Sequence, residues 1–217
     1  MAFFVYMEVK MDKSKVDLNK YKYKDMYERF MGEDNPSVCV TGTFDITNLI
    51  KIKNKGHSLN ALLCFVLMKA AETIEEFHYM IKEDGLYYYD HMKMNAVFKG
   101  KDDSLCYGSI KYFDGFLDFE NEYKRVRKYC YDNCLHYDED FGSMLSTSAV
   151  TNYPFESFSL STSKTFWDHF LMWGQYVKKL WKYKLTITLR FHHATIDGEH
   201  AGMFFNEVQN QINKLKL

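Results

Sequence analysis

The chain has 217 residues, enough for one domain with a sizeable buried core. Hydrophobic residues make up 47% and charged residues 26%, proportions typical of a folded globular protein and not of a disordered one. The formal net charge is −1, so the overall charge gives no support for binding to nucleic acid or to an anionic membrane.

The start of the chain, MAFFVYMEVKMDKSK, is apolar for only a few residues before charges begin. This stretch is too short for a signal sequence or a membrane span, and we expect it to form a first strand. The chain has five cysteines, an odd number, at irregular spacing. Without a secretory leader, this pattern favours reduced thiols over a disulfide framework, and hence a cytoplasmic protein.

The hydrophobic pattern predicts strands and helices interspersed along the chain. Alternation and β-branched residues predict strands at 38–46, 84–90, 94–100, 144–151, 156–161 and 185–193. Three- and four-residue spacing predicts helices at 58–74, 116–133 and 200–215. The elements lack a strict βαβ rhythm, and the chain has neither repeats nor a Gly- or Pro-rich linker. We therefore expect one α+β or mixed α/β domain over residues 1–217.

The last expected strand leads into the stretch FHHATIDGEH at 191–200. Strand alternation puts His193 on the apolar face with Leu189 and Phe191, whereas His192 faces the other way. Apolar surroundings favour the neutral imidazole, which is the form that accepts a proton. A base at the end of a strand and beside the start of a helix is a common position for chemistry.

Three interpretations of His193 remain open at this point. It can be a hydrogen-bonded core residue, which is the ordinary role of a strand histidine. A metal site needs three or four converging ligands, but His192 and His193 point to opposite faces and no carboxylate or Cys pair has ligand spacing nearby. The third interpretation is a general base, because His-x-x-x-Asp-Gly puts His193 and Asp197 on either side of a tight turn.

The longer stretch FHHATIDGEHAGMFFNEVQ resembles the signature of chloramphenicol acetyltransferases, in which paired histidines, Asp-Gly, a further His and an amphipathic helix follow in this order. The same H-x-x-x-D-G signature marks the acyltransferase core of 2-oxo acid dehydrogenase complexes. The resemblance covers most of the chain, through VDLNKY, FDITNLIKIKNKGHSLNALL, EFHYMIKEDGLYYYD, MNAVFKGKDDSL and TNYPFESF. It implies a two-layer α/β (α+β) sandwich in which helices cover a mixed sheet.

The resemblance also implies roles for particular residues. In the family, the second histidine of the pair is the general base for the acceptor hydroxyl, and His193 has that position. The activated oxygen attacks the thioester of acetyl-CoA. A serine three residues before a proline stabilises the oxyanion, and here Thr151 stands three residues before Pro154. Threonine keeps the hydroxyl donor, although threonine is also an ordinary strand residue.

Asp197 corresponds to an aspartate that supports the active-site turn in the family by pairing with an arginine near the N-terminus. This sequence has no arginine in the matching stretch, YKYKDMY. The aligned residue is Tyr23, flanked by Lys22 and Lys24. None of these three side chains offers the planar, bidentate fork of a guanidinium. The sequence therefore leaves open what Asp197 pairs with.

Further expectations concern the substrates. Met172 stands where the family has a threonine that contacts the intermediate through water. Tyr176 matches a tyrosine that contacts the pantetheine arm of CoA. Phe30 fits the aromatic acceptor pocket, but Val38 stands where the family has another aromatic residue. Lys178 and the lysines that follow it to position 184 are interpreted as a solvated helix end and not as a phosphate site.

The resulting prediction is a cytoplasmic chloramphenicol O-acetyltransferase that uses acetyl-CoA and no metal. Members of the family are homotrimers with active sites at subunit boundaries, so we expect a homotrimer acting on a small alcohol, without nucleic-acid or membrane partners. One alternative is a related acyltransferase with another acceptor, motivated by Met172 and Val38. Another is an inactive binding protein of the same fold. A role in a lipoyl-linked complex is set aside because no lipoyl domain or linker precedes this sequence.

Overall fold

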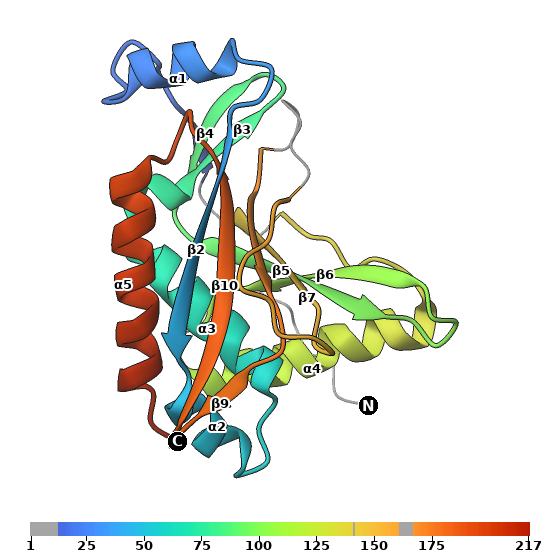
Figure 1. Ribbon diagram of the computed structural model, residues 1–217. Helices are drawn as coiled ribbons and strands as arrows, with labels where there is room; N and C mark the ends of the chain where they lie inside the picture. Colours follow the sequence, from blue (N-terminus) through green and yellow to red (C-terminus); the bar gives the residue numbers. More distant parts are fainter. Residues whose placement is uncertain (1–12, 141, 161–166) are drawn as a thin grey trace.

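The computed structural model describes residues 13–140, 142–160 and 167–217 (Figure 1). The strands of its large sheet are β2 (Ser37–Asp45), β5 (Met92–Lys99), β6 (Leu105–Lys111), β7 (Ser143–Ala149), β8 (His169–Trp173), β9 (Val177–Lys179) and β10 (Lys182–His192). Their order is β2-β10-β8-β7-β5-β6, and β9 forms a hairpin with β10. Strands β5, β7 and β8 run parallel, whereas the other neighbours run antiparallel.

A smaller sheet of three strands has the order β1-β4-β3. Its strands are β1 (Lys13–Lys15), β3 (Tyr79–Lys82) and β4 (Gly85–Tyr89). The helices of the described residues are α1 (Lys24–Met31), α2 (Thr47–Lys53), α3 (Leu59–Glu72), the 3-10 helix η1 (Glu75–His78), α4 (Phe116–Asn133) and α5 (Gly198–Lys214). In Figure 1, α1 and the β3–β4 hairpin lie at the upper end, whereas α2, β9 and the C-terminus lie at the lower end.

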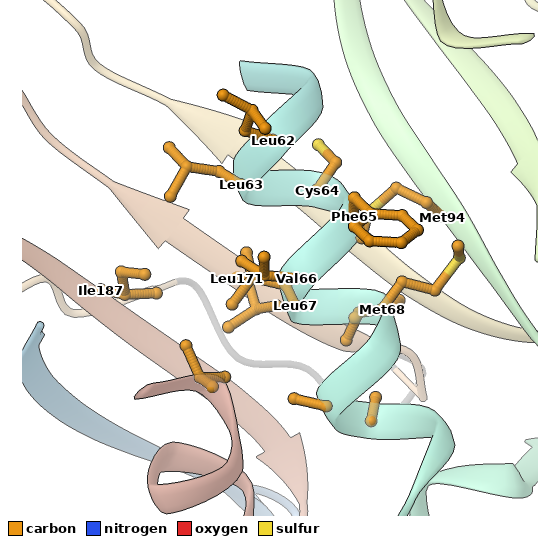
Figure 2. Packing of buried hydrophobic residues seen from close by; sticks show 14 of the residues in the cluster. Leu62, Leu63, Cys64, Phe65, Val66, Leu67, Met68, Met94, Leu171 and Ile187 are labelled. Carbon is orange, nitrogen blue, oxygen red and sulfur yellow. The ribbon is translucent and has the colours of Figure 1, made fainter. Parts of the chain in front are cut away.

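Helices α3, α4 and α5 cover one face of the large sheet, and α3 lies at the centre of this layer. Helix α3 begins at Ser58, whose hydroxyl accepts a hydrogen bond from the Ala61 amide at 3.3 Å. Most of its side chains are buried, because the sheet and the two flanking helices enclose it. Figure 2 shows them beside Met94 of β5, Leu171 of β8 and Ile187 of β10.

The expected mixed sheet with covering helices is confirmed. Helix α4 has the bounds predicted from its spacing, and the predicted cap Ser58 is in place. The strand expected at 156–161 was wrong for residues 156–160, and residue 161 lies outside the described residues. In this segment the Phe158 amide donates to the Thr188 side chain at 3.3 Å, and not to a neighbouring backbone. A side-chain bond of this kind holds a loop against the sheet without extending it.

Three other expectations differ from the structure in whole or in part. Of the first strand expected within residues 1–15, residues 1–12 lie outside the described residues, and β1 covers only Lys13–Lys15. Residues 16–21, which resemble the family's opening strand, form a turn closed by the Lys20 amide and the Asp17 carbonyl at 2.9 Å. The lysines between 178 and 184 lie on the β9–β10 hairpin and not at a helix end.

Two further properties follow from the described residues. None of the helices there is long and apolar enough to cross a membrane. All five cysteines fall within the described ranges, and each is a free thiol.

Candidate active site

His193 lies directly after the end of β10, and its half-buried imidazole is held between two aromatic rings. The ring stacks on Phe30 of α1 with a centroid distance of 4.1 Å and an interplanar angle of 10°. Phe191 meets it edge-on at 6.2 Å. The backbone amide of His193 donates to the Pro36 carbonyl at 2.9 Å, which ties the end of β10 to the segment entering β2. The imidazole therefore has a fixed orientation and largely apolar walls.

The Nδ1 atom of His193 is buried and has no hydrogen-bond partner among the described residues. Ser37 Oγ and His169 Nδ1 are buried and unpaired in the same way. Ser37 pairs with His192 across β2 and β10, and His169 opens β8, so these atoms come from the same end of the sheet as His193. A buried polar atom without a partner costs about 1–3 kcal/mol. Each such atom in a folded protein needs an explanation, and a catalytic role is one of them.

His192 and His169 are neutral at pH 7 for a clear physical reason. Burial lowers the pKa of His169 to about 4, and burial with the adjacent His193 lowers the pKa of His192 to about 4. The Nδ1 atom of His192 accepts a hydrogen bond from the Ala194 amide at 3.2 Å. His192 therefore shapes the turn that follows β10, whereas His193 is the histidine of the pair that faces Phe30.

The free energy of unfolding is expected to decrease as the pH falls from 6.5 to 4. Both histidines have folded-state pKa values near 4 against an ordinary value of 6.5, so the unfolded chain binds protons first. Above pH 6.5 both histidines are neutral in the folded and unfolded chains, and the free energy of unfolding has its full value. Acidification to pH 4 lowers this free energy by at most about 3 kcal/mol for each histidine. Urea unfolding of the His169→Gln variant should show a shallower decline than the wild type. The exposed His136→Gln variant should keep the wild-type slope, and equal slopes in all three proteins would contradict the assignment.

Asp197 is the N-cap of α5 and lies in the turn between His193 and the helix. Its Oδ1 accepts from the backbone amides of Glu199 at 2.9 Å and His200 at 3.1 Å. These bonds satisfy amides that a helix start leaves unpaired, and the carboxylate complements the positive end of the helix dipole. The Nδ1 atom of His200 lies 2.9 Å from the same oxygen. The partner of Asp197 is thus its own helix start.

Tyr23, aligned with the missing arginine, is the N-cap of α1, and its side chain contacts His200 in the first turn of α5. Its hydroxyl donates to Glu76 Oε1 at 3.0 Å and lies 3.2 Å from His200 Nε2. Both Glu76 and His200 are buried. Sequence reasoning missed these two residues, although Asp197 three positions before His200 is a recognisable capping-box spacing.

The structure brings Phe30 and Val38 to the same end of the sheet as His193. Phe30 makes the ring stack described above. Val38 of β2 is half-buried and lies opposite Phe191 of β10 in the register, packed against the main core. These two residues therefore belong to the surroundings of His193 within one chain.

Thr151 lies at the other end of the sheet. It follows β7 in an exposed turn, beyond Ala149, which pairs with Trp173 of β8. Trp173 pairs in turn with Ile187, six positions before His193 along β10. Because β7 and β10 run in opposite directions, Thr151 is farther still from His193, so at least about 20 Å separates the two residues within one chain.

Met172 and Tyr176 also lie away from His193. Met172 of β8 is half-buried and pairs with Thr188 of β10. Tyr176 follows β8, where its ring meets Tyr183 edge-on at 5.7 Å, and the Lys53 ammonium lies 5.8 Å from its centroid. Thr151, Met172 and Tyr176 thus share one region, and His193 lies in another.

A groove of about 430 Å³ opens beside Tyr176, at the end of the sheet where Thr151 lies. Its lining residues come from the 154–156 loop, β2, the end of β8 and the β9–β10 hairpin: Thr43, Pro154, Phe155, Glu156, Gln175, Val177, Lys179, Lys184 and Thr186. The groove combines an aromatic ring with two ammonium groups. Within the described ranges, no group of three or more His, Cys, Asp or Glu side chains converges as a metal site would require.

Comparison with known proteins defines first the fold and then the family. A solved chloramphenicol acetyltransferase superposes with a TM-score of 0.80 at 21% identity, covering 93% of this chain and 100% of that one. The dihydrolipoamide acetyltransferase of Azotobacter vinelandii gives a TM-score of 0.67 at 15% identity, with 88% and 86% covered. The chain therefore has the fold shared by these acyltransferases.

Sequence comparison then identifies the family. The family model described as "Chloramphenicol acetyltransferase" matches residues 11–209. The chloramphenicol acetyltransferase of Clostridium perfringens is 26% identical over 204 residues, covering 89% of this chain and 92% of the relative. That of Campylobacter coli is 24% identical over 220 residues, covering 93% and 99%. The chain belongs to the chloramphenicol acetyltransferase family, and it is an acyltransferase.

Proposed function

We propose that this acyltransferase moves the acetyl group of acetyl-CoA to a hydroxyl of chloramphenicol, with His193 as the general base. The observation that carries the proposal is the His193 imidazole. It occupies the base position of the family motif, stacks on Phe30 at 4.1 Å and has a buried, unpaired Nδ1 atom. A fixed imidazole between aromatic rings, at the edge of a region with several unpaired polar atoms, suits a base that receives an aromatic alcohol.

In the proposed reaction, the neutral His193 takes the proton of the acceptor hydroxyl as the oxygen attacks the thioester carbonyl. A carbon–oxygen bond forms, and the carbonyl electron pair moves to the oxygen as an oxyanion. The Thr151 hydroxyl donates a hydrogen bond to this oxyanion. Collapse of the intermediate then breaks the carbon–sulfur bond, and the proton held by His193 passes to the departing CoA thiolate. Asp197 supports the base by holding the turn that follows it.

We further propose that the active protein is a homotrimer whose active sites combine residues of two subunits. His193 and Thr151 are at least about 20 Å apart within one chain, so they can serve one reaction only if different subunits supply them. The nine-residue strand β2 also lies at the edge of the large sheet in the described residues. An edge strand of this length is a ready surface for pairing with another chain.

The groove beside Tyr176 supports binding of acetyl-CoA at the Thr151 side of such a composite site. Contrary to the interpretation from the sequence, Lys179 and Lys184 line this groove and suit the phosphates of CoA, and Phe155 offers a surface for the adenine ring. Tyr176 is our candidate for contact with the pantetheine arm, and Met172 for a contact near the thioester. Phe30 and Val38 are our candidates for the acceptor pocket on the His193 side.

A second candidate function is transfer to a different alcohol. Val38 replaces an aromatic residue of the family's acceptor pocket, and Met172 replaces a hydrogen-bonding threonine, so the pocket differs in shape and polarity from the one that the resemblance implies. The free thiols of all five cysteines support a cytoplasmic location for either function. Residues 1–217 are taken as one domain in both.

The two candidates are separated by following thiol release from acetyl-CoA with the purified protein. We expect release that depends on chloramphenicol and a product carrying one acetyl ester by mass spectrometry. Chloramphenicol already acetylated at its acceptor hydroxyl is the matched control and should release no thiol. Release that requires another alcohol favours the second candidate. Absence of release with every alcohol, together with absence of CoA binding by calorimetry, contradicts both and favours a binding protein that kept the fold.

A further inference from the structure

Four side chains meet where three elements converge behind the active-site turn. Tyr23 begins α1, Glu76 lies in η1, and Asp197 and His200 begin α5. Glu76 is 8% exposed and His200 5% exposed, so the contacts between them are shielded from water. The tyrosine hydroxyl is within hydrogen-bond distance of both. These contacts join segments that lie far apart along the chain.

The two ring nitrogens of His200 face oxygen atoms on opposite sides. Nδ1 lies 2.9 Å from the Asp197 carboxylate, and Nε2 lies 3.3 Å from the Glu76 carboxylate and 3.2 Å from the Tyr23 oxygen. The Nδ1 atom also accepts a hydrogen bond from the Asp197 backbone amide at 3.2 Å, so Nε2 is the nitrogen that carries the N–H toward Glu76. His200 therefore links the start of α5 to Glu76 and Tyr23 through its two ring nitrogens.

Helix α1 connects this cluster to the base. Tyr23 at its start touches His200, with ring centroids 5.4 Å apart, and Phe30 in its last turn stacks on His193. The helix thus spans the turn from His193 to His200 and contacts both of its ends. A change in the position of α1 would move the ring that packs against the proposed base.

We propose that Tyr23, Glu76 and His200 are positioning residues for acetyl transfer, holding α1 and the start of α5 so that His193 keeps its orientation. This inference rests on the function proposed above. None of the three residues contacts His193 itself, and each acts through α1 or through the helix start. In this chain the buried cluster takes the place of a direct arginine–aspartate pair.

The test replaces Tyr23 and leaves the proposed base untouched. Tyr23→Phe removes the hydroxyl and keeps the ring, and we expect kcat to fall by about 10- to 100-fold, because a small misplacement of a catalytic group has an effect of this size. The KM for acetyl-CoA should stay within about twofold, since none of the residues that line the groove lies in α1, η1 or α5. Tyr23→Arg should recover most of kcat, because a guanidinium can bridge Glu76 and Asp197.

Tyr27→Phe is the matched control, because Tyr27 is a mostly buried tyrosine of the same helix and its hydroxyl lies outside the cluster. It should leave kcat unchanged. Wild-type kcat in Tyr23→Phe, or a loss that Tyr23→Arg does not recover, would overturn the inference. An equal loss in Tyr27→Phe would overturn it as well, because the effect would then belong to α1 in general.

A measurement independent of activity separates this inference from the proposed function. The NMR resonance of the His193 ring, assigned by its disappearance in His193→Gln, should shift in Tyr23→Phe and return toward its wild-type position in Tyr23→Arg. Tyr27→Phe should leave it in place. If the wild type acetylates no alcohol, the proposed function fails while the resonance still tests the cluster. A resonance that does not respond to Tyr23→Phe contradicts the positioning role whatever the activity.

Discussion

Replacing His193 with alanine is expected to lower kcat by about 10²- to 10⁴-fold, the range that a positioned general base contributes. The substitution removes the only group in the proposed mechanism that takes the proton of the acceptor hydroxyl. It also removes the ring that packs on Phe30, so folding and assembly are checked by circular dichroism and analytical ultracentrifugation. The rate is measured as chloramphenicol-dependent thiol release.

His136→Ala serves as the control for loss of a histidine, because this side chain is exposed in the segment after α4, away from the turn that follows β10. It should keep the wild-type rate. Turnover of His193→Ala within a fewfold of wild type, with the assembly intact, would remove the general-base assignment. The proposed mechanism would then have no group to accept the proton.

The second large effect is expected at Thr151. Thr151→Ala should lower kcat by about 10²- to 10³-fold, the loss seen when one donor to an oxyanion is removed. Thr151→Ser keeps the hydroxyl and should stay close to the wild type. An unchanged rate in Thr151→Ala would mean that this exposed threonine is an ordinary turn residue.

Mixing two inactive variants tests whether the site is shared between subunits. His193→Ala and Thr151→Ala, co-expressed with different affinity tags, should form mixed trimers in which about one site in three has an intact histidine facing an intact threonine. Activity in the doubly purified trimers should therefore exceed that of either variant alone. Mixed trimers without this gain would show that the two residues do not complete a common site.

The loss of the family arginine is less damaging to the active-site turn than the sequence suggests. Asp197 has three contacts at its own helix start, two of them to backbone amides. Tyr23 still contributes from the aligned position, but through His200 and Glu76. Because these contacts hold the turn, the absent arginine gives little weight to the alternative of an inactive binding protein.

Strong local patterns were read correctly from the sequence. Helix α4 was predicted with its observed bounds because Phe116, Phe119, Tyr123 and Val126 repeat at helical spacing and are buried on one side. Ser58 was predicted as a cap because its hydroxyl can bond within the next turn. The choice of His193 over His192, made by alternation and by the family motif, stays a prediction. Each of these features depends on residues within a few positions of one another.

Features that depend on distant residues were missed or misjudged. The 156–160 segment has strand-like residues, but it is held by the Thr188 side chain and forms a loop. The short strands β6, β8 and β9 were not predicted. Their sequences show little alternation, because whether such a segment forms a strand depends on its packing against neighbouring strands.

The sequence by itself determined the family and the mixed fold, since alternation and motif spacing are local properties of the chain. Only the tertiary structure decided which distant groups meet. Tyr23 and His200 are separated by 177 positions, yet their side chains touch because the fold brings the start of α1 to the start of α5. The sheet register likewise separates Thr151 from His193. Because β7 and β10 run in opposite directions, the residues that follow them lie at opposite ends of the sheet.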